Sequence, residues 1–365
     1  MERKNVGIIT RHFISNYGSF LQCYATIRTL DSLGYNGQII NYIPNEENIK
    51  NDGDFTAKKK KLSNFKKLIY NLFVTPQHKK SAKKFENYRE KYLNCSPQYD
   101  ESSISNCKYD IYMSGSDQLW GPIGTNDYDL NYFLKFTDSP NKIAYSSSFG
   151  YSSFNKKYDS IFKQELLKFK AISVREASAC DYLTSIGIPS TLVLDPTFFL
   201  SKSNYKKESD GFFIKEKPTI LIYQLHHESI AKKFGLLAAK EINGTVLSIL
   251  PNPARYVPFS HIKVVYNPFE FLAYIDNAKF IITDSFHATV FSIIYNKQFI
   301  AVNPGNTATR IKNILNLLGL SERYQENPTT VALLNKINYN DVNMRLNTLV
   351  NSSKKTLLVE LNKCK

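Results

Sequence analysis

Short apolar runs alternate with longer amphipathic stretches along the first half of the chain. The runs are bounded by turn residues, as in buried β-strands. They fall at Val6–Thr10, Gln38–Tyr42, Tyr109–Met113, Ile143–Ser146, Ala171–Val174 and Leu192–Leu194. Between some of them, apolar residues recur at helical spacing over Ser19–Leu33, Tyr158–Lys168 and Ala177–Ile186. Strands that alternate with helices predict parallel βαβ units in a doubly wound sheet.

The second half repeats this pattern. Segment 199–218 interrupts the rhythm with Ser, Lys, Gly and Pro residues and predicts a domain boundary. Further strands are predicted at Thr219–Tyr223, Thr245–Leu250, Lys263–Val265, Lys279–Thr283 and Phe299–Val302. Further helices are predicted at Ser229–Ile242, Pro268–Asn277, His287–Tyr295, Thr309–Leu318 and Val342–Asn362.

The doubled pattern predicts an α/β protein with two Rossmann-like domains that face a cleft, as in the GT-B arrangement. We expect an N-terminal domain over 1–205, a C-terminal domain over 206–340 and a C-terminal helix over 341–365 that crosses back to the first domain. The cleft between the domains is then the default place for a ligand.

Composition favours a soluble cytoplasmic protein. Of the 365 residues 42% are hydrophobic and 22% charged, and no run approaches the roughly 20 apolar residues of a membrane span. The N-terminus lacks the apolar core of a signal peptide. The five cysteines are scattered and show no metal-ligand spacing, so we expect neither a disulfide framework nor a metal site.

The net charge of +15 is concentrated in one segment. Residues 57–91, a predicted basic helical insertion, hold twelve basic and two acidic residues. The rest is nearly balanced, so we expect no nucleic-acid partner. Within 57–73, lysines flank an apolar stripe at helical spacing made of Leu62, Phe65, Ile69, Leu72 and Phe73. The stripe predicts either a helix lying on an anionic membrane surface or a helix packed on the protein itself.

Polar residues follow several predicted strands of the first half. Asn16, Gly18 and Ser19 form a loop before a helix, which suits either an anion or a tight turn. Asp117 follows Ser-Gly-Ser after a strand and is either a functional carboxylate or a helix cap. Two further candidates are the hydroxyl residues Ser146 and Ser147, which could hydrogen-bond a sugar or a carboxylate.

Arg175 also follows a strand and precedes a helix, where a guanidinium suits a phosphate or a carboxylate, or else an interdomain salt bridge. Asp195-Pro196 reads as a structural turn. In the second half, His226 and His227 follow the first predicted strand, and one of them could face the cleft.

The stretch "FIITDSFHATVFSIIYN" places His287 between a buried strand and a helix, with Asp284 and Ser285 as candidate N-caps. A histidine there can donate or accept a proton beside a bound anion, or simply bond a backbone carbonyl. Arg310, in the first turns of the helix that follows Gly305, belongs to a second candidate anion pocket or is a solvated arginine.

Taken together, these motifs resemble the polysaccharide pyruvyl transferase family over roughly residues 5–320. The stretches that carry the resemblance, in chain order, are "NYGSFLQCYA", "SGSDQLWG", "YSSSFG", "SVREASACDYL", "LDPTFFL", "TDSFHATVFSI" and "RIKNILNLLGL". The resemblance implies a GT-B-like enzyme that moves the pyruvyl group of phosphoenolpyruvate onto two hydroxyls of one sugar. The product is a cyclic ketal, phosphate is released, and neither a metal nor a redox cofactor is required.

The resemblance also implies roles for His287, Asp117 and Arg175, and the other candidates come from the motifs described above. His287 and Asp117 are the expected acid and base, without an assignment of which is which. The expected donor-binding residues are Arg175, Arg310, Ser285, Asn16, Gly18 and Ser19, and the expected acceptor-binding residues are Ser146, Ser147 and His226. Many members carry Arg where this chain has Ser285, so Arg310 or a lysine is expected to supply the cation, or the donor differs.

The acceptor is expected to be a saccharide, either free or lipid-linked. With a lipid-linked acceptor, the protein could sit peripherally at the inner face of the membrane through 57–73. Two other classes of function share this fold. One is a GT-B glycosyltransferase that uses a nucleotide sugar, and the other is a family member that binds ligands without turnover. Titration of phosphoenolpyruvate against nucleotide sugars separates the three.

Overall fold

The computed structural model of the protein describes residues 2–44, 75–122, 128–215, 217–225, 230–241, 243–251, 261–305, 308–327 and 335–364. The chain divides into two compact units. Unit 1 comprises residues 1–14, 19–199 and 351–365, and unit 2 comprises residues 15–18 and 200–350. Two helices therefore have residues in both units: α1 (Tyr17–Ser32) and α14 (Tyr339–Asn362).

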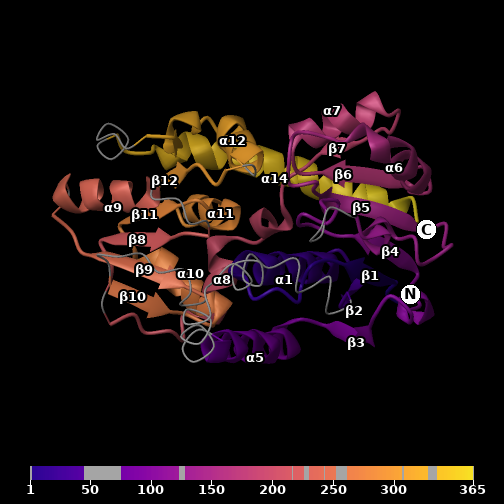
Figure 1. The fold of residues 1–365 in the computed structure, drawn as a ribbon, viewed down its shortest axis with the longest axis horizontal. Coiled ribbons are helices and arrows are strands. Elements are labelled where there is room, and N and C mark those ends of the chain that lie inside the picture. Colours follow the sequence, from indigo (N-terminus) through magenta and orange to yellow (C-terminus); the bar gives the residue numbers. More distant parts are fainter. Residues whose placement is uncertain are drawn as a thin grey trace, which may run out of the picture. The chain divides into compact units, whose positions relative to one another are not determined.

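Unit 1 is built on a parallel sheet with the strand order β3-β2-β1-β4-β5-β6-β7 in the described part of the chain (Figure 1). Its strands are β1 (Asn5–Ile9), β2 (Asn36–Tyr42), β3 (Cys95–Tyr99), β4 (Ile111–Ser114), β5 (Lys142–Ser147), β6 (Ala171–Val174) and β7 (Thr191–Leu192). Its α-helices, apart from the two shared ones, are α5 (Thr75–Tyr92), α6 (Asp159–Leu166) and α7 (Ala177–Ser185). The chain places β2 and β3 on one side of β1 and then crosses from β3 to β4 on the other side, so the sheet is doubly wound.

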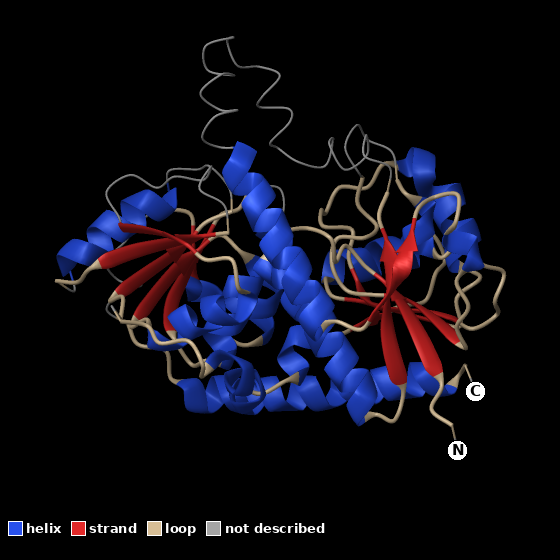
Figure 2. Ribbon diagram, turned by 90° about the horizontal axis from the view of Figure 1, so that it is seen from below, coloured by secondary structure: helices blue, strands red, loops and turns tan. Residues whose placement is uncertain are grey.

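Unit 2 repeats this design with a second parallel sheet, in the order β10-β9-β8-β11-β12-β13 over the described residues. Its strands are β8 (Ile220–Tyr223), β9 (Val246–Leu250), β10 (His261–Val264), β11 (Phe280–Thr283), β12 (Gln298–Val302) and β13 (Tyr324–Gln325). Its α-helices are α8 (Lys202–Ser209), α9 (Ile230–Glu241), α10 (Pro268–Asn277), α11 (Phe286–Ile294) and α12 (Ala308–Leu317). Helices lie beside the strands of both sheets (Figure 2).

Each unit has its own apolar core. The core of unit 1 is rich in aromatic rings: Trp120 stacks on Phe133 at 5.3 Å between ring centroids, and Phe149 packs edge-on against Trp120. In unit 2 the core joins strand residues that are completely or almost completely buried, among them Ile220, Ile282 and Ile300, to the buried face of α9. Strands buried on both faces read as continuous apolar runs, which is why the sequence pattern located them.

The prediction of a doubly wound α/β protein is confirmed. Each predicted strand and helix coincides with an observed element to within a few residues at its ends. The sequence pattern missed β3 and β13, which lie at the sheet edges, and it missed α8 inside the predicted boundary segment. The predicted stripe over 57–73 and residue His226 lie outside the described residues. Within the described residues no helix is long and apolar enough to cross a membrane.

Candidate functional site

Asp117 lies just beyond β4 in a strained backbone conformation. Its φ is 98°, and Ser146, near the end of the neighbouring β5, has a φ of 58°. Residues with side chains rarely adopt such angles, and when they do the cost is of order 1–3 kcal/mol and the residue is often at a functional site. Asp117 also forms an isolated parallel bridge with Ser147, which keeps the two strand extensions in register. The carboxylate is therefore held in a fixed place at the carboxyl end of the sheet.

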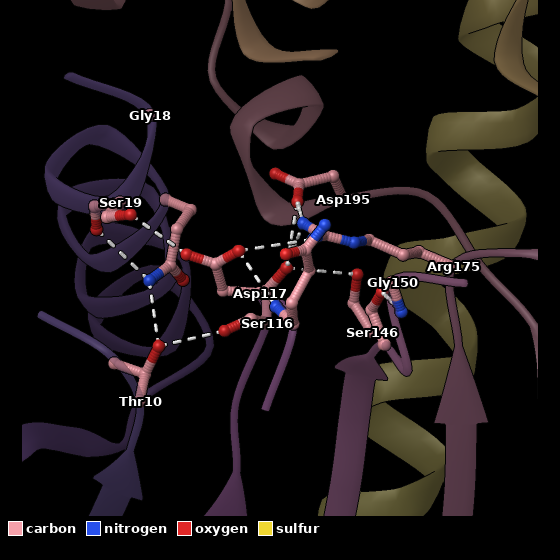
Figure 3. Close-up of polar contacts among 12 residues, drawn as sticks. Thr10, Gly18, Ser19, Ser116, Asp117, Ser146, Gly150, Arg175 and Asp195 are labelled. Carbon is pink, nitrogen blue, oxygen red and sulfur yellow. Dashed lines mark hydrogen bonds and ion pairs between the residues drawn. The ribbon is translucent and has the colours of Figure 1, made fainter. Parts of the chain in front are cut away.

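Arg175 lies between two carboxylates at this end of unit 1 (Figure 3). Its Nη1 is 2.7 Å from Oδ2 of Asp195, and its Nη2 is 3.3 Å from Oδ1 of Asp117. The side chains of Arg175 and Asp195 have 1% and 0% of their surface exposed, whereas that of Asp117 keeps 12%. Of the three, Asp117 alone thus presents surface at which a substrate could bind.

Burial and neighbouring charges act in opposite directions on Arg175. Burial alone would lower the pKa of the guanidinium, but the carboxylates of Asp195, Asp117 and Glu176 raise it above its usual value. Glu176 lies 4.0 Å from Nε of Arg175 and accepts a hydrogen bond of 2.6 Å from Ser148. Arg175 is consequently a permanent cation surrounded by acidic groups.

Hydroxyl groups complete the surroundings of these acids. Ser19, in the first turn of α1, donates to Oδ2 of Asp117 at 2.9 Å, and Ser116 donates to Oδ2 of Asp195 at 2.8 Å. Ser146 and Ser147 have no exposed surface. The hydroxyl of Ser147 donates to the carbonyl oxygen of Gly115 at 3.0 Å, which ties β5 to the loop that carries Asp117.

Asn16 caps α1. Its Oδ1 accepts a hydrogen bond of 2.8 Å from the backbone N–H of Gly18. Tyr17 anchors the same turn inside unit 2, since its hydroxyl donates to the carbonyl oxygen of Val265 at 2.6 Å and its ring stacks on Phe271 at 4.4 Å. The sequence-based candidates Asn16, Gly18 and Ser19 thus form one helix start.

His287 lies in the first turn of α11 in unit 2 and is 8% exposed. Ser285 caps this helix, because its side chain accepts from the N–H of Ala288 at 3.4 Å. Asp284, the other predicted cap, instead accepts from the N–H of Leu225 at 2.6 Å. The imidazole ring packs against Gly18, where a Cβ atom would lie 2.0 Å from its Nδ1.

Arg310, in α12, belongs to the same surroundings as His287. Its guanidinium carbon lies 5.5 Å from the centre of the Phe286 ring, and that ring is 5.1 Å from the imidazole of His287. A guanidinium over an aromatic face is held in place without losing its charge. Unit 2 therefore brings together Ser285, His287 and Arg310, and unit 1 brings together Ser19, Asp117 and Arg175.

Asp195 and His12 are among the polar residues of unit 1 that were not predicted as parts of a site. Asp195 was interpreted as a structural turn; it does accept from the N–H of Thr197 at 3.0 Å, but its other oxygen binds Arg175. His12 is buried, which lowers its pKa, and its ring nitrogens meet the carbonyl of Thr10 and the side chain of Asn41. Asp195 follows the strand next to β6, and this adjacency of strand ends was the only available signal.

Over the residues described, no group of three or more His, Cys, Asp or Glu is arranged to hold a metal ion.

Comparisons with known proteins agree with this architecture. A family model described as polysaccharide pyruvyl transferase matches residues 16–306. A search of curated proteins finds no match.

Among solved structures, UDP-N-acetylglucosamine 2-epimerase from Rickettsia bellii is 12% identical with a TM-score of 0.52, covering 98% of this chain and 96% of that chain. UDP-GlcNAc 2-epimerase from Neisseria meningitidis, bound to UDP-GlcNAc, is 12% identical with a TM-score of 0.46, covering 95% and 99%. ADP-heptose lps heptosyltransferase II from E. coli is 11% identical with a TM-score of 0.39, covering 96% and 99%. The likeness to the first of these concerns the fold alone, and the fold is GT-B-like.

Proposed function

Because the chain belongs to the polysaccharide pyruvyl transferase family, we propose that it transfers the pyruvyl group of phosphoenolpyruvate to a sugar. The sugar belongs to a cell-surface polysaccharide or its precursor. Two of its hydroxyls bond to C2 of the pyruvyl group, a cyclic ketal forms and phosphate leaves. The observation that carries the proposal is the buried ion-pair cluster in which Asp117, in a strained conformation, retains an exposed edge.

The reaction requires proton transfers, which suit the two candidate groups. Protonation of C3 of phosphoenolpyruvate builds positive charge at C2, a sugar hydroxyl attacks C2 and loses its proton, and phosphate departs before the second hydroxyl closes the ring. Of the two hydroxyl protons, one is balanced by the new methyl group and the other by the released phosphate. His287 and Asp117 are proposed to move these protons.

The donor carries a carboxylate and a phosphate, so it calls for cations and N–H groups. We assign Arg310 and the capped start of α11 at Ser285 to the donor, together with the start of α1. The latter comprises Asn16, Gly18 and Ser19. Assignment of the acceptor to Ser146, Ser147 and His226 stays a prediction, and the two serines would act through the strand end that they fix.

A lipid-linked saccharide is the acceptor class that would explain the basic segment. The described part of that segment, α5, exposes Lys79, Lys80, Lys83 and Lys84, whose spacing places them on one side of the helix. Anionic lipids attract such a side at about 1 kcal/mol per lysine. The first unit would then associate with the membrane at which its acceptor resides.

The test is calorimetric titration with phosphoenolpyruvate, UDP-GlcNAc and GDP-mannose, paired with phosphate release from phosphoenolpyruvate in the presence of lipid-linked saccharides. We expect binding of phosphoenolpyruvate and acceptor-dependent phosphate release. Asp117→Asn should abolish release, whereas Asp181→Asn, an exposed carboxylate on α7, should not. Binding of a nucleotide sugar alone would indicate a glycosyltransferase, and binding without turnover would indicate a non-catalytic member.

A further inference from the structure

We infer that Arg175 and Asp195 are positioning residues that keep Asp117 ionised and in place, which makes Asp117 the base of the proposed reaction and leaves donor binding to other cations. This inference rests on the proposed function. It differs from the sequence-based expectation, which assigned Arg175 to the donor. The observations behind it are the burial of the guanidinium and the number of carboxylates around it.

The burial of Arg175 leaves a donor little access to its guanidinium. The Arg175 side chain is 1% exposed, and both terminal nitrogens already face carboxylate oxygens, at 2.7 Å in Asp195 and 3.3 Å in Asp117. A donor phosphate would have to displace one of these acids. Breaking a buried ion pair is strongly unfavourable, because it leaves an uncompensated charge.

The charges around Arg175 disfavour an anionic donor. Three carboxylates, those of Asp195, Asp117 and Glu176, act on Arg175. With every group ionised the cluster carries more negative than positive charge, so it repels a donor that bears a carboxylate and a phosphate. The same charge distribution attracts a proton, and a hydroxyl group that must lose a proton needs such surroundings. The electrostatics of the cluster therefore suit proton acceptance better than anion binding.

Hydrogen bonds hold Asp195, Arg175 and Asp117 in fixed positions. Asp195 receives a hydrogen bond from Ser116 on one oxygen and from Thr197 on the other, so the Asp195 carboxylate cannot turn away from Arg175 without losing both. Arg175 in turn fixes Oδ1 of Asp117, which also accepts from the N–H of Gln118 at 2.8 Å. The anchored carboxylate of Asp195 thus holds the guanidinium of Arg175, and this guanidinium holds the carboxylate of Asp117, which reacts.

The contacts of Asp117 favour its ionised form. A guanidinium within hydrogen-bonding distance favours the charged form of a carboxylate, as do hydrogen bonds donated to it. Asp117 has both, since Ser19 donates to its second oxygen. The titratable or charged groups of this cluster include Arg175 just after β6, Asp195 from beyond β7, Glu176 at the start of α7 and the buried thiol of Cys23 in α1. Only Arg175 among these favours ionisation, so its loss has a predictable sign.

The experiment observes Asp117 directly. The side-chain carboxyl carbons of aspartate are labelled with carbon-13, the Asp117 signal is assigned by its loss in Asp117→Asn, and its pH titration is followed in the wild type, Arg175→Gln and Arg175→Lys. Arg3→Gln, at an exposed arginine, is the control. We expect Arg175→Gln to move the titration midpoint of Asp117 to higher pH, Arg175→Lys to move it less, and the control to leave it unchanged. Circular dichroism checks that each variant is folded.

Binding and turnover separate positioning from donor contact. If the inference holds, Arg175→Lys and Asp195→Asn keep the Kd for phosphoenolpyruvate within about threefold of the wild type and lower kcat by about 100-fold, the scale for a displaced functional group. The acidic limb of the kcat profile moves to higher pH in Arg175→Lys.

An unmoved titration midpoint in Arg175→Gln overturns the inference. So does an Arg175→Lys variant with a tenfold higher Kd and a wild-type kcat at saturating donor. A wild type that binds no phosphoenolpyruvate overturns the proposed function instead, while the titration of Asp117 still decides the positioning role.

Discussion

Gly18 packs so closely on His287 that a Cβ atom at position 18 would lie 2.0 Å from Nδ1 of the imidazole. No real Cβ atom tolerates that distance, so a side chain at position 18 would displace the ring. The hydroxyl of the next residue along the helix, Ser19, donates a hydrogen bond to the carboxylate of Asp117. Gly18 and His287 belong to unit 2, and Ser19 and Asp117 belong to unit 1, so each of these contacts lies within one unit.

Gly18→Ala should therefore destabilise the protein and impair turnover. Glycine to alanine inside a helix normally stabilises by about 1 kcal/mol, but overpacking a filled site costs about 1–3 kcal/mol, and the clash with the imidazole decides the sign. We expect a lower melting temperature and at least about tenfold lower kcat, measured by calorimetry and phosphate release. Gly211→Ala is the matched control, because nothing lies within 4 Å of an added Cβ there. Equal stability of the two variants would refute the close packing.

His287→Ala should lower kcat for phosphate release by about 100-fold or more, the usual contribution of a general acid or base. The loss should appear in kcat and not mainly in KM, because the imidazole is assigned to proton transfer and not to donor binding. An unchanged circular dichroism spectrum shows that the variant is folded. Full phosphate release by this variant would contradict the role.

Glu360 should make the stability of the protein depend on pH. Burial raises the pKa of this carboxyl on α14 to about 7, against a hydrogen bond from Ser173 that lowers it. Between pH 4.5 and about 7 the folded protein then keeps a proton that the unfolded chain releases. The free energy of unfolding consequently falls as pH rises through this range, by about 3 kcal/mol at most.

The Glu360→Gln variant keeps the shape of the side chain and removes the titration. We expect urea unfolding at pH 5 and pH 8 to show a smaller difference for Glu360→Gln than for the wild type. Glu241→Gln, at an exposed carboxylate on α9, should retain the wild-type difference. If Glu360→Gln retains it as well, the proton resides elsewhere.

The basic segment should bind anionic vesicles. Replacing Lys58, Lys59, Lys60 and Lys61 by Gln removes four charges, each worth about 1 kcal/mol near an anionic surface. Co-sedimentation with phosphatidylserine vesicles should therefore fall strongly, and the wild type should lose binding as salt is raised. A control variant carries Gln at four exposed lysines elsewhere, Lys108, Lys156, Lys336 and Lys355. Equal and negligible pelleting of all three proteins would favour a helix that packs on the protein itself.

The alternation of apolar runs with amphipathic stretches was enough to predict the doubly wound class and most elements. Strands such as Phe280–Thr283 are buried throughout and almost entirely apolar because both faces of a parallel sheet are covered by helices, and that requirement is local. The weakest predictions fell at the edges. The edge strand Cys95–Tyr99 carries polar residues and a proline, so it has no such signal.

The positions of single polar residues at strand ends were also visible in the sequence, since Asp117, Arg175 and His287 each follow an apolar run. The partner of each one was not visible. Asp195 reads as a turn because its contact with Thr197 is local, whereas its contact with Arg175 depends on β6 and β7 lying side by side. The sequence alone determined which chemical groups stand at the carboxyl ends of the strands. Which charges face each other became visible only in the folded chain, because pairing between segments distant along the chain depends on strand order and burial.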